Sequence, residues 1–209
     1  MTALALGVLV SGTGTNLQAI LDAVSARRLD ADVRVVISNK PEALALERAR
    51  ARGVPAVTLS HKGYATRDAF DAALVEKLRE HGVEWVVLAG FMRLLTRTML
   101  EGFKNRIVNI HPSLLPAFPG VDAQKQALDY GVKISGCTVH LVDEGTDTGP
   151  ILMQRAVPVL DTDDVDALRA RILEQEHALL VETLRALARG KLVLSPGDDG
   201  RVRAHLGAE

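Results

Sequence analysis

Short apolar runs alternate with amphipathic segments through the first half of the chain, and this alternation restricts the possible fold more than any other feature. The runs are rich in β-branched residues and predict strands, while the segments between them have helical periodicity. Strands that alternate with helices require right-handed crossovers, which build a mainly parallel sheet with helices on both faces. We predict strands at 3–10, 32–38, 55–60, 84–90 and 106–110, and helices at 15–28, 41–52, 66–81 and 96–103.

The pattern changes after residue 120. A helix is predicted at 122–130, and two longer strands at 134–142 and 151–159 are separated by only eight residues, which favours an antiparallel pair. A long helix at 162–189 should end at Gly190. The fold class is therefore α/β, a single Rossmann-like domain at 1–190 with an antiparallel C-terminal addition to its twisted sheet. The remaining residues, 191–209, are a C-terminal tail that is polar and loop-like from Ser195, and we assign it no function.

Composition excludes several classes of partner. The 209 residues carry 25 Lys and Arg against 26 Asp and Glu, a net charge of −1, so we expect no nucleic acid and no membrane surface as partner. The apolar run at 3–10 is about half as long as a membrane-spanning helix. Cys137 is the only cysteine, which excludes an internal disulfide, suits the cytoplasm and argues against a cysteine-based metal site. A small-molecule substrate fits best.

A glycine-rich loop, SGTGTN at 11–16, follows the first predicted strand and precedes the first helix. Backbone N–H groups at such a position can hold an anion. A dinucleotide site is contradicted, because Leu17 occupies the position of the third glycine and Ser38 and Asn39 replace the expected acid. A phosphate monoester remains as the candidate ligand. The alternative is that Thr15 or Asn16 simply caps the helix.

The stretch NIHPSLLPAFPG at 109–120 ends the fifth predicted strand with polar residues. Asn109 and His111 are two residues apart on an extended chain, so both point the same way. An amide can donate to an oxyanion, and an imidazole can exchange a proton near pH 7. The alternative is a turn asparagine and a partly buried histidine bonded to the backbone.

The acidic loop at 143–149, DEGTDTG, could supply a carboxylate that orients His111. It lacks the spacing and the closing glutamate of a calcium loop, so a solvated turn is the stronger alternative to a catalytic role. His140, on the strand before this loop, is interpreted as a histidine bonded to the backbone, with a position that faces the site as the alternative.

Five motifs in order resemble the phosphoribosylglycinamide formyltransferases, over roughly residues 3 to 190. They are SGTGTN, AGFMRLL at 89–95, NIHPSLLPAFPG, GCTVHLVDEGTDTGPIL at 136–152 and EQEHALL at 174–180. The resemblance implies formyl transfer from 10-formyltetrahydrofolate, as co-substrate, to the amine of glycinamide ribonucleotide in de novo purine synthesis. It implies no metal, and a monomer or homodimer.

The same resemblance implies roles for individual residues. Asn109 and protonated His111 would stabilise the tetrahedral oxyanion, while Asp147 would raise the population of that imidazolium and place a water. The ribonucleotide would be held by Gly14, Thr15, Asn16, Gln175 and Glu176. The folate would contact Arg67, Met92, Arg93, Leu94, Leu95, Asn109, Asp143, Glu144, Gly145, Thr146 and Asp147. For Glu176 the alternative is a solvated charge, and for Met92 and the leucines it is core packing.

Other functions share part of this pattern. Formyltetrahydrofolate hydrolase and methionyl-tRNA formyltransferase would use the same Asn, His and Asp, but we expect the former to carry an N-terminal regulatory domain and the latter an additional C-terminal domain. A non-catalytic phosphate-binding module would keep the glycine loop without needing His111 and Asp147 to meet.

Overall fold

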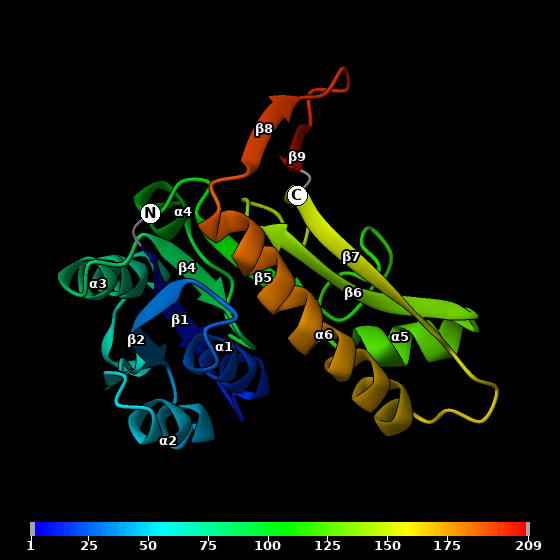
Figure 1. The fold of residues 1–209 in the computed structure, drawn as a ribbon, viewed down its shortest axis with the longest axis horizontal. Helices are drawn as coiled ribbons and strands as arrows, with labels where there is room; N and C mark the ends of the chain where they lie inside the picture. Colours follow the sequence, from blue (N-terminus) through cyan, green and yellow to red (C-terminus); the bar gives the residue numbers. More distant parts are fainter. Residues whose placement is uncertain (1–2, 208–209) are drawn as a thin grey trace. The chain divides into compact units, whose positions relative to one another are not determined.

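The computed structural model describes residues 3–207, and the chain divides into two compact units that meet in sequence at Asn109 and Ile110. Figure 1 shows the ribbon, coloured along the chain. Each unit is described by itself below.

The first unit contains a parallel sheet. Its strands are β1 (Leu4–Val10), β2 (Ala31–Ser38), β3 (Ala56–Thr58), β4 (Trp85–Leu88) and the start of β5 (Ile107–His111). They lie in the order β3-β2-β1-β4-β5, and every pairing is parallel. All seven residues of β1 are buried, which explains its unbroken apolar sequence, because a central parallel strand is covered on both faces.

Four α-helices accompany this sheet: α1 (Thr15–Ser25), α2 (Leu44–Ala51), α3 (Arg67–Glu80) and α4 (Arg97–Gly102), with a 3-10 turn, η1, at His61–Gly63. Helix α1 packs against α2, and α3 packs against α4. From β1 the sheet extends in one direction through β2 to β3, and in the opposite direction through β4 to β5. Right-handed crossovers therefore place the α1–α2 pair and the α3–α4 pair on opposite faces of the sheet.

The second unit is built on an antiparallel pair, β6 (Ile134–Leu141) and β7 (Ile151–Pro158). Helix α5 (Ala123–Tyr130) precedes this pair, and α6 (Val165–Ala188) packs against both of its strands, as can be followed in Figure 1. Asp164 caps α6 by accepting the Ala167 N–H at 2.8 Å. Gly190 follows the helix with φ 67°, and the expected left-handed stop is confirmed.

The prediction of a loop-like tail was wrong. Residues Leu192–Pro196 and Val202–Leu206 form an antiparallel hairpin, β8 and β9, and β9 contacts β7. Leu192, Leu194 and Leu206 share one half-buried face of this hairpin. The glycines that suggested a loop make its turn, where the Gly197 N–H donates to the Arg201 carbonyl at 2.7 Å.

The fold class is confirmed as α/β, with a mainly parallel sheet and an antiparallel C-terminal addition. Within residues 3–207, none of the helices has both the length and the apolar character needed to span a bilayer.

Gly136 lies where β6 packs closely against β7 in the second unit, so a substitution there tests this packing. A Cβ at this position would lie 2.0 Å from the Arg155 carbonyl oxygen on β7, and backbone on both strands would have to move. We expect Gly136→Ala to lower the free energy of unfolding by about 3 kcal/mol, measured by urea denaturation. The control is Ser135→Ala. Its buried hydroxyl has no hydrogen-bond partner among residues 3–207, so its removal should not lower stability. Equal losses in the two variants would contradict this account.

Candidate functional site

The glycine loop leads directly into the N-terminus of α1. The residue at the N-cap position is Gly14, with φ 73°, and it makes no side-chain cap hydrogen bond. The alternative that Thr15 or Asn16 merely caps the helix is therefore wrong. The first turn also contains no acidic residue, so the N–H groups and the positive end of the helix dipole are suited to an external anion.

The shape of this loop depends on contacts with α2. A Cβ on Gly14 would lie 2.5 Å from the Ala45 Cβ and 2.8 Å from its Cα. Arg48, also on α2, donates from Nε to the Thr13 carbonyl at 2.8 Å. Glycine is required at position 14 both by its positive φ and by this close approach.

The segment at 90–95 lies beside the glycine loop within the first unit. The Ser11 hydroxyl accepts the Met92 N–H at 3.0 Å and donates to Asn39 at 2.7 Å. Met92 and Leu94 are 71% and 59% exposed, so the core-packing alternative is wrong for both of them. The structure thus joins two of the segments that the sequence assigned to different ligands.

Helix α3 supports the same segment from its own side. Arg67 donates to the Leu94 carbonyl at 3.1 Å, and the Arg93 guanidinium lies 5.1 Å from the centre of the Phe70 ring. Buried Asp71 accepts the Thr96 N–H at 2.6 Å. Burial raises the pKa of Asp71. These contacts hold residues 93–96 in a defined shape.

Asn109 and His111 lie on β5, and the alternation of a strand directs both to the same side. His111 is 4% exposed, and its Nε2 lies 2.8 Å from the Phe118 carbonyl oxygen. The Ser113 hydroxyl also donates into this proline-rich loop, to the Ala117 carbonyl at 2.5 Å. The loop therefore bends back over the imidazole that precedes it.

The acidic loop brings Asp147 to His111. His111 Nδ1 lies 3.3 Å from Asp147 Oδ2, and the same oxygen accepts the Gly120 N–H at 2.8 Å. Burial opposes ionisation of Asp147, but His140, Gly120 and His111 together outweigh it and lower the pKa of Asp147. The carboxylate is ionised at neutral pH.

The protonation of His111 differs from the expectation. Burial lowers the pKa of His111, and it outweighs the opposing contributions of the Phe118 carbonyl and of Asp147. Asp147 does favour the imidazolium, as expected, but the net direction is toward the neutral ring. Because Phe118 offers only an acceptor, the proton of the neutral ring resides on Nε2.

His140 has a contact that sequence reasoning missed. Its Nδ1 lies 2.8 Å from the Leu141 carbonyl oxygen, which is the backbone bond that was expected. Its Nε2 lies 3.6 Å from Asp147 Oδ1. The ring therefore has both the backbone bond and a position that faces the site, and the partner that sequence reasoning did not identify is Asp147.

The other acidic-loop residues form a self-bonded turn. Asp143 accepts the Gly145 N–H at 3.1 Å and the Thr148 hydroxyl at 2.7 Å. Residues 143–146 are exposed, whereas Asp147 is half-buried. In the part of the chain that the structure describes, no group of three or more His, Cys, Asp or Glu side chains could hold a metal ion.

Gln175 and Glu176 lie on α6. Glu176 is only 7% exposed, so the alternative of a solvated surface charge is wrong. Burial, with the Glu176 carboxylate as the next contribution, raises the pKa of Cys137 to about 12. A buried carboxylate is rare in proteins without a partner or a function.

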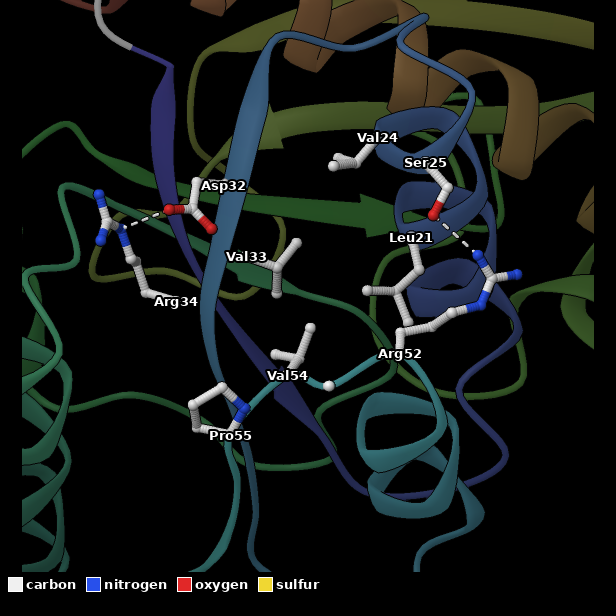
Figure 2. Close-up of a pocket in the computed structure, with 10 residues that line it drawn as sticks. Leu21, Val24, Ser25, Asp32, Val33, Arg34, Arg52, Val54 and Pro55 are labelled. Carbon is white, nitrogen blue, oxygen red and sulfur yellow. Dashed lines mark hydrogen bonds and ion pairs between the residues drawn. The ribbon is translucent and has the colours of Figure 1, made fainter.

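A cavity of about 410 Å³ in the first unit contains none of the predicted site residues. Figure 2 shows its lining, with Arg52 directed to Ser25 and Arg34 to Asp32. These β2 residues lie near the amino end of the strand, opposite the edge where parallel sheets bind ligands. The charged groups that line it are paired, so we do not assign it a ligand.

Comparison with known proteins supports the family suggested by the motifs. Residues 5–184 match the family described as Formyl transferase. The chain is 43% identical over 180 residues to phosphoribosylglycinamide formyltransferase of Bacillus subtilis, covering 86% of this chain and 92% of that protein. The solved structure of glycinamide ribonucleotide transformylase 1 from Symbiobacterium toebii superposes with a TM-score of 0.95 at 53% identity, covering 99% of this chain and 95% of that one.

A longer relative contains a similar segment. The trifunctional purine biosynthetic protein adenosine-3 of Drosophila melanogaster is 51% identical over 191 residues, which is 90% of this chain but only 14% of that protein. This chain therefore spans about 14% of the length of that relative.

Proposed function

Since this chain belongs to the formyl transferase family, we propose that it transfers a formyl group from 10-formyltetrahydrofolate to the amine of glycinamide ribonucleotide. The products are formylglycinamide ribonucleotide and tetrahydrofolate, and the reaction is a step of de novo purine synthesis. The observation that carries the proposal is the buried contact of 3.3 Å between His111 Nδ1 and Asp147 Oδ2, two residues that the family resemblance assigns to catalysis.

The contacts of His111 suggest how the reaction would proceed. Attack of the amine nitrogen on the formyl carbon produces a tetrahedral oxyanion. His111 carries a proton on Nε2 even as a neutral ring, so it can donate to this oxyanion once the Phe118 carbonyl gives way to the substrate. Asn109 supplies a second donor from the same strand. Asp147 then stabilises positive charge that develops on the imidazole.

Proton transfer completes the reaction. The nitrogen of the amine must lose one proton, and the folate nitrogen that leaves must gain one, so the net reaction needs no external acid or base. Asp147 and His111 are placed to guide this transfer, directly or through one water.

Substrate contacts are proposed by the same reasoning. The uncapped start of α1 at Gly14, Thr15 and Asn16 supports binding of the ribonucleotide phosphate, and Gln175 and Glu176 are proposed for the ribose and amine side. The exposed side chains of Met92 and Leu94, together with Arg67, Arg93, Leu95, Asn109 and residues 143–147, are proposed for the folate. We place the enzyme in the cytoplasm as a monomer or homodimer that acts on small molecules.

A direct assay tests this function. The protein is mixed with glycinamide ribonucleotide and a 10-formyl folate, and release of the deformylated folate is followed by absorbance. We expect turnover that depends on the ribonucleotide. Turnover without it would indicate a hydrolase, and binding of the ribonucleotide without turnover would indicate a non-catalytic module.

The glycine loop gives a separate prediction about binding. Gly14→Ala combines a positive φ with a clash against Ala45, so the loop should shift and the KM for the ribonucleotide should rise about tenfold or more, with a smaller change in kcat. Gly12→Ala is the matched control, because a Cβ on Gly12 meets nothing within 4 Å. Steady-state kinetics with varied ribonucleotide measures both. A KM that is unchanged in Gly14→Ala would remove the loop from the binding site.

A further inference from the structure

His140 is buried at the end of β6 and fixed there by the backbone. It is 2% exposed, and the pairing of β6 with β7 shifts by one residue between Val139 and His140. Such irregularities re-aim side chains and are common beside active sites. Because the Leu141 carbonyl can only accept, the ring nitrogen that faces it, Nδ1, must carry a proton.

The same reasoning applies to His111. Its Nε2 faces the Phe118 carbonyl and must carry a proton. Each ring therefore has one nitrogen that faces a backbone carbonyl and one that faces Asp147. His111 Nδ1 lies 3.3 Å from Oδ2 of this carboxylate, and His140 Nε2 lies 3.6 Å from Oδ1.

This arrangement needs an additional proton. When both rings are neutral, two nitrogen lone pairs face the oxygens of an ionised carboxylate, which is repulsive. A proton on either ring turns that contact into a charge-assisted hydrogen bond. Protons on both rings would place two positive charges against one negative charge, so the cluster is suited to one additional proton.

The electrostatic contacts within the cluster are mutual. Asp147 and His140 act electrostatically on His111, and His111 and His140 act on Asp147. Glu176 and Arg155 act on Cys137, which precedes His140 by three residues on β6.

We propose that His140 is a positioning residue for Asp147, and that His111 Nδ1 and His140 Nε2 share one exchangeable proton through the two oxygens of that carboxylate. The role of this shared proton in catalysis rests on the proposed formyl transfer. There, the cluster can give its additional proton to the leaving folate nitrogen and take up the proton lost by the attacking amine, so one N–H bond forms, another breaks and the cluster ends with the one proton it began with.

NMR of the ring nitrogens tests the shared proton without any assay of activity. In protein labelled with 15N-histidine, we expect neutral His111 as the Nε2–H form and neutral His140 as the Nδ1–H form, and His111 should titrate in two linked steps. In His140→Asn, His111 should titrate in a single step at higher pH, because the positive neighbour is gone. A single-step titration of His111 in the wild-type protein, or a His111 midpoint that does not move in the variant, would overturn the proposal.

Kinetics test the positioning role. We expect His140→Asn to lower kcat about 10- to 100-fold, less than the loss of a direct acid-base group, with both KM values within about twofold. His140→Gln retains an amide donor near Asp147 and should recover part of kcat, but it should not restore the linked titration. Ser135→Ala, a buried polar change on the same strand, is the control and should leave kcat unchanged.

The outcomes separate this inference from the proposed function. An unchanged kcat in His140→Asn, with an unchanged pH profile, would contradict the positioning role while leaving formyl transfer intact. A wild-type protein without formyl transfer would refute the function, and the NMR titration would still decide whether the proton is shared.

Discussion

His111→Ala should lower kcat for formyl transfer about 10³-fold while leaving the KM for the ribonucleotide within about twofold. The variant removes the Nε2–H donor that would meet the oxyanion, and it removes the partner of Asp147 at Nδ1. Both interactions matter in the transition state more than in the ground state, so the loss should fall on kcat. Single-turnover and steady-state kinetics with both substrates varied would measure it.

The control for this variant is His81→Ala. His81 follows α3 and has its own backbone contact, between Nδ1 and the Lys77 carbonyl at 2.9 Å, so it tests the loss of a structural histidine. We expect full activity in His81→Ala. If His111→Ala instead lost stability and both substrate affinities in proportion to kcat, His111 would be a structural residue and the proposed mechanism would be wrong.

Much of this arrangement can be predicted from sequence because its causes are local. The apolar run of β5 ends at polar residues, and strand alternation alone places Asn109 and His111 on one side. The three prolines that follow exclude regular structure, so the irregular loop at 112–122 could also be foreseen. The helix stop at Gly190 depends on one residue and its positive φ.

The features that sequence reasoning missed depend on tertiary structure. The hairpin of β8 and β9 was mistaken for a loop, because its short apolar strands gain their burial only from each other and from β7. The contact of His140 with Asp147 requires the turn at 143–149 to fold back on β6. The spacing of residues along the sequence does not predict that this turn folds back on β6.

The direction of the His111 pKa could not be predicted for a related reason. A neighbouring carboxylate can be inferred from motifs, and it does favour the charged ring. Burial acts in the opposite direction and is the larger effect here, and the degree of burial of one side chain is a property of the packed structure. The sequence therefore predicted the partner but not the balance between the two effects.

The second large effect is expected for Asp147→Asn, which should lower kcat about 10²- to 10³-fold. An asparagine oxygen can still accept the Gly120 N–H, so the loop should keep its shape and ribonucleotide affinity should change little. What is lost is the negative charge that favours protonation of His111. The expected defect is therefore in proton transfer rather than in folding.

The pH dependence of Asp147→Asn has a sign that can be worked out. In the wild-type protein, Asp147 partly offsets the effect of burial on the His111 ring, so its neutralisation should lower the pKa of His111 further below the ordinary value of 6.5. His140→Asn should move the same pKa upward. Titration of His111 by NMR in both variants, with pH profiles of kcat/KM, would measure the two shifts. Shifts of the same sign would show that the two residues do not act on His111 through opposite charges, and they would contradict the shared proton.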